Sequence, residues 1–130
     1  MSVARIQEEL ELLRKFYPKL EFVESGLWIR ILDYPIPQDR QWNKTATDVA
    51  FQIPAGYPGT PPYGIYVPQG LTCNGSSPPN ANQQPPFGGQ WGILSWTPVD
   101  GQWRPSTNIS SSSNLLNWVR SFVDRFKEGL

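Results

Sequence analysis

Apolar side chains near the start of the chain recur every three or four residues. These positions are Val3, Ile6, Leu10, Leu13 and Tyr17. Such spacing places them on one face of an α-helix and leaves the charged residues between them on the solvated side. The charged residues are Glu8, Glu9, Glu11, Arg14 and Lys15. Because Pro18 cannot continue a helix, the pattern predicts a helix over residues 3–17.

Short runs of alternating, β-branched and aromatic residues follow this helix. They cover residues 20–24, 27–33, 47–53 and 64–67. Residues of these types suit the pleated, half-buried surface of a sheet. The four runs therefore predict a four-stranded antiparallel meander. A further apolar run at residues 91–96 is too short to be given an element.

The part of the chain after the fourth run is polar until its last helix. Residues 68–89 are almost all Pro, Gly, Asn, Gln, Ser and Thr. A segment of this composition buries too little apolar surface to order itself, so it predicts a long mobile loop. Helical spacing returns over residues 110–126, after serines that can cap a helix. Helix, meander, long loop and helix together predict an α+β fold in a single domain over residues 1–130.

Charge and the rare residue types exclude several classes of function. Lys plus Arg equals Asp plus Glu at 11 each, so no global field recruits nucleic acid or an anionic membrane. No apolar run is long enough to span a bilayer. The chain has one cysteine and no histidine. It therefore lacks the residues for a Ser-His-Asp triad, a common transition-metal site or an internal disulfide, and we expect no metal or cofactor and a reducing, cytoplasmic location.

Two proline-containing segments point to a family. The segment Tyr57-Pro58-Gly59-Thr60-Pro61-Pro62 resembles the Tyr-Pro-x-x-Pro-Pro signature of ubiquitin-conjugating enzymes. That family also has a Trp-x-Pro motif eight residues beyond its catalytic cysteine, followed by a helix. Here Trp103-Arg104-Pro105 precedes the last helix, and the residue eight positions before Trp103 is Ser95. The resemblance covers residues 1–128 and is strongest over 49–119.

A third match is partial. The family has a His-Pro-Asn tripeptide about a dozen residues after its paired prolines, and the same count here reaches Thr72-Cys73-Asn74. Asn74 thus falls at the family's asparagine, while the histidine and proline are absent. The loop between Asn74 and Ser95 is longer than the family's by about a dozen residues. Among its relatives the chain resembles most the divergent bacterial branch, whose members are often encoded beside ubiquitin-like proteins and an activating enzyme.

The resemblance implies a fold and an acyl-transfer chemistry. The fold would be that of ubiquitin-conjugating enzymes, with the long loop beside the active site. The chain would accept the C-terminal acyl group of a ubiquitin-like protein from an activating enzyme, as an oxyester on Ser95, and pass it to an acceptor. Asn74 would donate a hydrogen bond to the oxyanion formed during attack. Alternatively, Asn74-Gly75 is only a tight turn, because that dipeptide is a strong turn former.

A serine hydroxyl needs a neighbouring base, and this chain has no histidine to supply one. Asp33, Asp48, Asp100 or a group of the partner enzyme would have to act instead. Two alternatives stay open: the chain is a catalytically inert variant that serves as a scaffold, or Ser95 is an engineered replacement for cysteine. Cys73, the only thiol, lies far from the position of the catalytic residue and is interpreted as an inert residue.

Two further features are candidate partner contacts. In the resembled family the first helix docks the activating enzyme, which makes Arg5, Arg14 and Lys15 candidate contacts; otherwise they belong to a solvated face. Most of the six tryptophans are expected in the core. Trp42 stands in a polar stretch, so it is the tryptophan expected at the surface and in contact with a partner.

Overall fold

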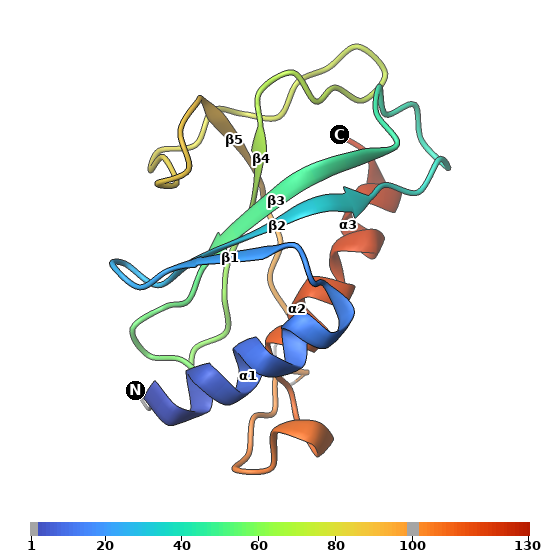
Figure 1. Cartoon of the computed structure of the whole chain (residues 1–130). Coiled ribbons are helices and arrows are strands. Elements are labelled where there is room, and N and C mark those ends of the chain that lie inside the picture. The colour runs from blue at the N-terminus through green and yellow to red at the C-terminus, as the bar shows by residue number, and fades with distance from the viewer. Residues whose placement is uncertain (1–2, 99–101) are drawn as a thin grey trace.

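The computed structural model describes residues 3–98 and 102–130. A helix, α1 (Val3–Phe16), precedes an antiparallel sheet, and two short helices end the chain (Figure 1). The strands are β1 (Leu20–Val23), β2 (Trp28–Pro35), β3 (Ala46–Gln52), β4 (Ile65–Pro68) and β5 (Trp91–Leu94). The final helices are α2 (Leu115–Arg120) and α3 (Phe122–Glu128), after a 3₁₀ turn, η1 (Ile109–Ser111). The predicted α+β class and the helix at each end are confirmed.

The sheet is a meander in the order β1-β2-β3-β4-β5, with every neighbouring pair antiparallel. The prediction of four strands was wrong, because Trp91–Leu94 pairs along its whole length with β4. Neither alternation nor a run of β-branched residues marks this strand in the sequence. Its second residue, Gly92, weakens a strand by propensity and is needed here for a close approach of the backbone.

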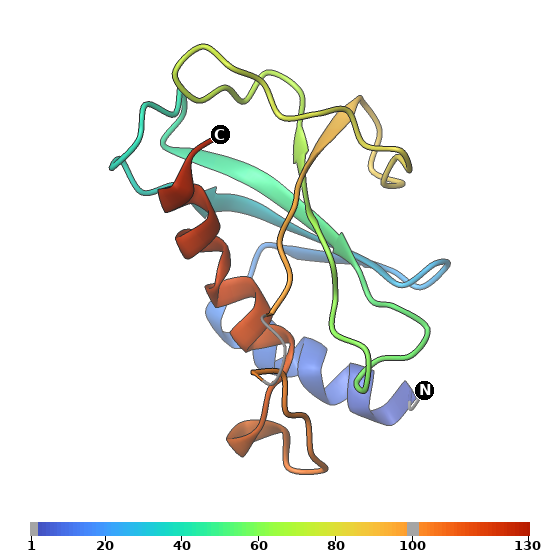
Figure 2. The ribbon, with the colours of Figure 1, turned by 180° about the vertical axis from the view of Figure 1, so that it is seen from behind.

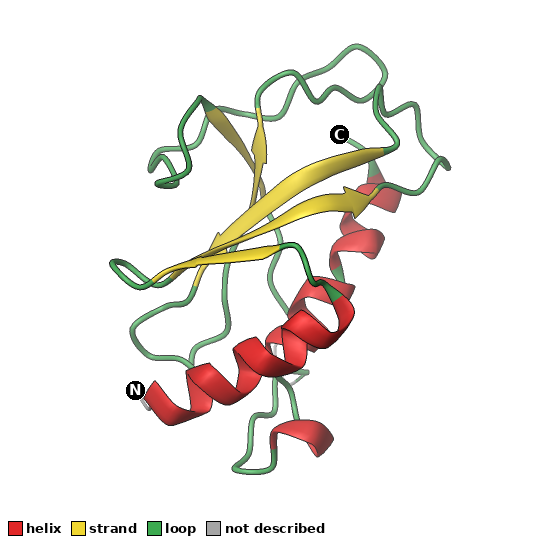
Figure 3. Cartoon of the chain, in the orientation of Figure 1, coloured by secondary structure: helices red, strands yellow, loops and turns green. Residues whose placement is uncertain are grey.

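The helices share one hydrophobic core on one face of the sheet (Figure 2). Ile6, Leu10 and Leu13 of α1 join the inward residues of β2 and β3 in this core. The predicted last helix is divided into α2 and α3 at Ser121 (Figure 3). It begins only at Leu115, because Asn114 caps it: the Asn114 side chain accepts from the Asn117 N–H, and the Asn117 side chain accepts in return from the Asn114 N–H.

The segment between β4 and β5 follows a path fixed by hydrogen bonds, where its composition predicted a mobile loop. The Ala81 N–H donates to the Trp91 carbonyl at 3.0 Å, and the Ile93 N–H donates to the Pro79 carbonyl at 2.9 Å. Phe87 lies against Trp91 and under the guanidinium of Arg30. Backbone pairing to the edge of β5 thus supplies the order that apolar composition does not.

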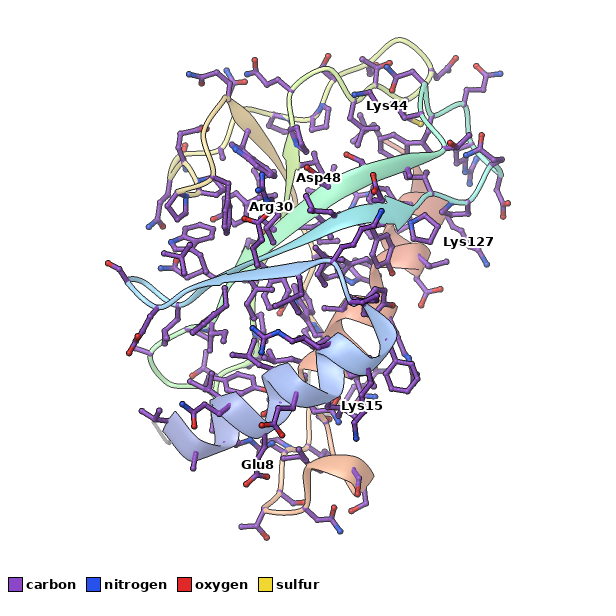
Figure 4. All side chains as sticks on the ribbon, viewed as in Figure 1. Glu8, Lys15, Arg30, Lys44, Asp48 and Lys127 are labelled. Atoms are coloured by element: carbon purple, nitrogen blue, oxygen red, sulfur yellow. The ribbon has the colours of Figure 1, made fainter. Side chains whose placement is uncertain are left out.

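Two residues expected at the surface are buried. Trp42 is 6% exposed, and its indole N–H donates to the Phe126 carbonyl at 2.8 Å. Glu9 is 1% exposed, while its neighbour Glu8 lies on the outer side of α1 (Figure 4). Both expectations failed because polar groups elsewhere in the fold satisfy these side chains, and helical spacing contains no information on such partners.

Glu9 joins three parts of the chain. Its carboxylate is paired with the Arg5 Nε at 2.8 Å, and it accepts from the Tyr57 hydroxyl at 2.5 Å and from the Leu115 N–H at 2.6 Å. Burial first, and then the Glu9 carboxylate, raise the pKa of Tyr57 above its usual range. One buried carboxylate therefore ties α1 to the proline-rich turn and to the start of α2.

Candidate functional site

Ser95 lies directly after β5, where the chain leaves the sheet for the helices. Its side chain is exposed, and no hydrogen bond of its hydroxyl occurs among the described residues. Its carbonyl accepts from the Arg125 Nε at 3.1 Å. Residues 95–98 form an extended segment that we call the arm. The arm is attached to the residue before β4, because the Gly64 N–H donates to the Trp96 carbonyl at 2.8 Å.

The two proline motifs of the sequence meet beside the arm. The Trp103 indole N–H donates to the Pro58 carbonyl at 2.7 Å, and its ring lies 6.0 Å from that of Tyr57, centroid to centroid. The Thr97 hydroxyl donates to the Pro62 carbonyl at 3.1 Å. The Tyr57–Pro58 peptide bond is cis. The structure therefore brings together the two proline-containing segments that carry the resemblance.

Asn74 occupies a tight turn in the segment between β4 and β5. The Cys73 and Ser76 backbones exchange hydrogen bonds of 2.8 and 2.9 Å across Asn74 and Gly75, whose φ angles are +51° and +81°. Two positive φ angles in a two-residue turn are the geometry that Asn-Gly favours. The Asn74 backbone N–H donates to the Gln41 carbonyl at 2.8 Å, while its side chain is exposed and makes no hydrogen bond within the described residues. Its geometry matches the turn interpretation.

The chain segments that lead to Asn74 and to Ser95 leave the sheet at opposite ends of the β4–β5 pair. Ile65 is opposite Leu94, and Pro68 is opposite Trp91, so the two ends of the β4–β5 pair are distinct. Ser95 follows the Leu94 end, whereas Asn74 comes six residues after the Pro68 end. At about 3.3 Å per residue, the strand pair alone places roughly 10 Å between those ends. No hydrogen bond between the Asn74 side chain and the Ser95 hydroxyl occurs among the described residues.

The candidate bases are also placed by the register. Asp48 precedes Ala50, which is opposite Tyr66, so Asp48 lies toward the Pro68 end of β4 and away from Ser95. Its carboxylate accepts from the Asp33 N–H at 3.2 Å. Asp33 has a φ of +56° at an irregularity of β2 and pairs with Lys19 at 2.9 Å. Asp33 and Asp48 therefore support a bulge in the sheet, and Asp100 lies outside the described residues.

Cys73 is 5% exposed and lies beside Gly129, at 3.3 Å from where a Cβ atom of that glycine would be. A buried thiol at this position is packed and closed to large reagents. In the parts of the chain that the structure describes, no cluster of His, Cys, Asp and Glu could hold a metal ion. No helix in the same parts is long and apolar enough to cross a bilayer.

The three basic candidates of α1 differ in their surroundings. The Arg5 guanidinium is paired with Glu9 and also donates to the Ser106 and Ser113 carbonyls. Arg14 and Lys15 are exposed, and Lys15 lies on the outer side of α1 (Figure 4). The Arg5 side chain is thus engaged in contacts within the fold. Of the three candidates, Arg14 and Lys15 are the ones exposed to a partner.

A pocket of about 300 Å³ opens between the arm and the helices, and we call it the arm pocket. Its described lining residues are Trp96, Thr97, Pro98, Gln102, Trp103, Ser113, Asn117, Trp118, Ser121 and Asp124. Asp124 is the one residue among them with a formal charge. Neither Asp124 nor Arg125 was singled out in the sequence. Nothing in the residues of the last helix indicates that the face with these two side chains lies beside the arm.

Searches against models of protein families, against curated proteins and against solved structures each find no match.

Proposed function

We propose that this chain is a ubiquitin-conjugating-enzyme-like binding module that works in the cytoplasm in the conjugation of a ubiquitin-like protein, without an active-site nucleophile of its own. The observation that supports this proposal most is the contact between the Tyr57–Pro62 turn and Trp103, the two segments in which the resemblance is strongest. The order of helix, meander, long connection and helix supports the same family of folds. The partners would be the ubiquitin-like protein and its activating enzyme, the latter on the exposed face of α1 around Arg14 and Lys15.

Binding is favoured over catalysis because the chemistry at Ser95 is incomplete. A serine hydroxyl attacks an acyl group only when a base accepts its proton or a site strongly polarises it. Asp33 and Asp48 are at the far end of the β4 register and support a bulge. The segment that carries Asn74 leaves the sheet at the end of the β4–β5 pair opposite to Ser95, and no hydrogen bond joins the two side chains among the described residues. The described residues thus place no base beside Ser95, and a module with these features can hold an acyl-transfer partner without activating the serine.

One observation favours a second candidate function, an acyl carrier that forms an oxyester on Ser95. The Ser95 side chain is exposed, and the Arg125 guanidinium contacts the same residue through its carbonyl. A nearby cation favours the alkoxide over the hydroxyl. In that case the base would come from the activating enzyme. The hydroxyl would attack the activated carboxyl of the ubiquitin-like protein, and the proton would pass to that base as the activating group leaves.

The two functions differ in the covalent product. We would mix the protein with its activating enzyme, ATP and the ubiquitin-like protein, and measure masses under non-reducing conditions. A binding module gives no adduct. A carrier gives an adduct that survives thiol reductant, is cleaved by hydroxide or strong hydroxylamine, and disappears with Ser95→Ala.

Two variants make the result specific. If Ser95 carries the acyl group, Ser95→Cys should give a reductant-sensitive thioester, since the thiol is more acidic than the hydroxyl. Asn74→Gly keeps a residue suited to positive φ and removes the amide, so a slower discharge in this variant would assign Asn74 to catalysis and not only to the turn. An adduct on the unmodified protein would reject the nucleophile-free module in favour of the carrier.

A further inference from the structure

The described lining of the arm pocket combines aromatic walls with one negative charge. Trp96 and Trp103 are half-buried and line it from the arm side, while Asp124 lines it from the first turn of α3. About 300 Å³ is the lower end of the range for ligand pockets, so the pocket suits one side chain better than a cofactor. Aromatic faces and a carboxylate together attract a cation.

The hydrogen bonds around the pocket occupy the indole N–H groups of Trp96 and Trp103, whereas the buried indole N–H of Trp118 has no partner among the described residues. The Trp96 indole N–H donates to the Ser121 hydroxyl at 2.8 Å, and that hydroxyl donates to the Trp118 carbonyl at 2.6 Å. The Trp103 indole N–H is held by the Pro58 carbonyl. The two indole rings are thereby fixed, and they offer the pocket their π-systems and not their N–H groups.

The Asp124 carboxylate, by contrast, is available to a ligand. Its side chain is exposed, and none of the three ion pairs formed by described residues includes it. Arg125, the next residue, directs its guanidinium to the Ser95 and Gly129 carbonyls. An acidic side chain in the first turn also stabilises a helix, so Asp124 has a purely structural alternative that an experiment must separate.

We propose that the arm pocket binds the guanidinium of an arginine side chain of a partner protein, with Trp96 and Trp103 as aromatic contacts and Asp124 as the counter-charge. Arginine is favoured over lysine because its planar group both stacks on aromatic rings and pairs with a carboxylate. The inference deepens the proposed function, on which it rests, by naming the chemistry that the partner presents beside Ser95.

The test uses a small probe, Nα-acetyl-arginine methylamide, and the indole N–H resonances of the ¹⁵N-labelled protein. Saturable shifts are expected at Trp96 and Trp103. Trp42 and Trp91, whose indoles are bonded to the Phe126 and Gly88 carbonyls, are internal controls that should not shift. The citrulline analogue, which is neutral and nearly the same shape, should bind at least about tenfold more weakly, and the lysine analogue should fall between them.

A matched pair of variants separates binding from helix stabilisation. Asp124→Asn should weaken arginine binding about tenfold or more, whereas Asp33→Asn, which removes another exposed carboxylate, should leave it unchanged. An unchanged indole spectrum in the absence of probe shows that Asp124→Asn still folds. Equal binding of the citrulline analogue, equal binding by Asp124→Asn, or no shift at Trp96 and Trp103 would overturn the proposal.

The same protein preparation distinguishes this inference from the proposed function. Binding of the ubiquitin-like protein without any response to the arginine probe would reject the arginine-binding pocket and support the proposed binding module. A response to the arginine probe without binding of the ubiquitin-like protein or its activating enzyme would support the arginine-binding pocket and reject the proposed role in ubiquitin-like conjugation.

Discussion

Replacing Glu9 by glutamine is expected to lower the free energy of unfolding by about 3–5 kcal/mol, as is usual when one partner of a buried ion pair is removed. The substitution removes the charge that balances Arg5 and replaces an acceptor of the Tyr57 hydroxyl and the Leu115 N–H by an amide. For a domain of this size the thermal midpoint should fall by roughly 10 °C or more. Thermal unfolding followed by circular dichroism measures the change.

Glu8→Gln is the matched control, because Glu8 is the adjacent residue, exposed on the outer side of α1. It should change the free energy of unfolding by no more than about 0.5 kcal/mol. Alkaline pH tests the same cluster from the Tyr57 side. Burial raises the pKa of Tyr57, so the stability from its neutral form is complete below about pH 10 and is lost as the pH rises toward the raised pKa. Equal midpoints for Glu9→Gln and Glu8→Gln would show that the buried cluster does not stabilise the fold.

Replacing Gly92 by alanine is expected to detach residues 79–81 from the edge of β5. A Cβ atom on Gly92 would lie 2.9 Å from the Pro79 carbonyl oxygen and 3.1 Å from the Pro78 Cβ, so one backbone must move. Forcing extra atoms into such a contact typically costs about 1–3 kcal/mol. Hydrogen exchange of the Ala81 and Ile93 amides, which donate across this contact, should accelerate in the variant.

Gly59→Ala serves as the comparison, because a Cβ there meets its nearest neighbour, the Gly56 carbonyl oxygen, at an ordinary 3.4 Å. It should leave the exchange of Ala81 and Ile93 unchanged. The unmodified protein is informative too. Rapid exchange of both amides before any substitution would mean that the segment is mobile, as its composition predicts, and that its pairing to β5 is not stable in solution.

The sequence predicted those elements whose apolar pattern is local. The helical spacing of Ile6, Leu10 and Leu13 and the alternation of Thr47–Ile53 correspond to α1 and β3, because one face of each element meets a single core. β5 was missed because its edge pairs with a proline-rich segment, which periodicity cannot reveal. Its glycine is required by the approach of Pro78 and Pro79, not by the strand itself.

The candidate site was predictable only in part. Counting back from Trp103 placed Ser95 at the start of the arm, and Thr97 of the arm contacts the same proline-rich turn as Trp103. Asn74 was placed by counting forward from the paired prolines, but its position relative to Ser95 depends on the sheet register and on the path of the chain after β4, which spacing does not encode. The burial of Glu9 and the approach of Asp124 to the arm depend on how the last helices pack, for which a single sequence has no direct signal.

The central claim is that the chain binds its conjugation partners without using a nucleophile. The most direct measurement is a titration of the fluorescently labelled ubiquitin-like protein, alone and with its activating enzyme, with the unmodified protein and with Ser95→Ala. We expect a saturable complex whose Kd is the same for both proteins within about a factor of two, because truncating one exposed hydroxyl removes no buried contact. The absence of a complex with either partner for the unmodified protein would contradict the claim.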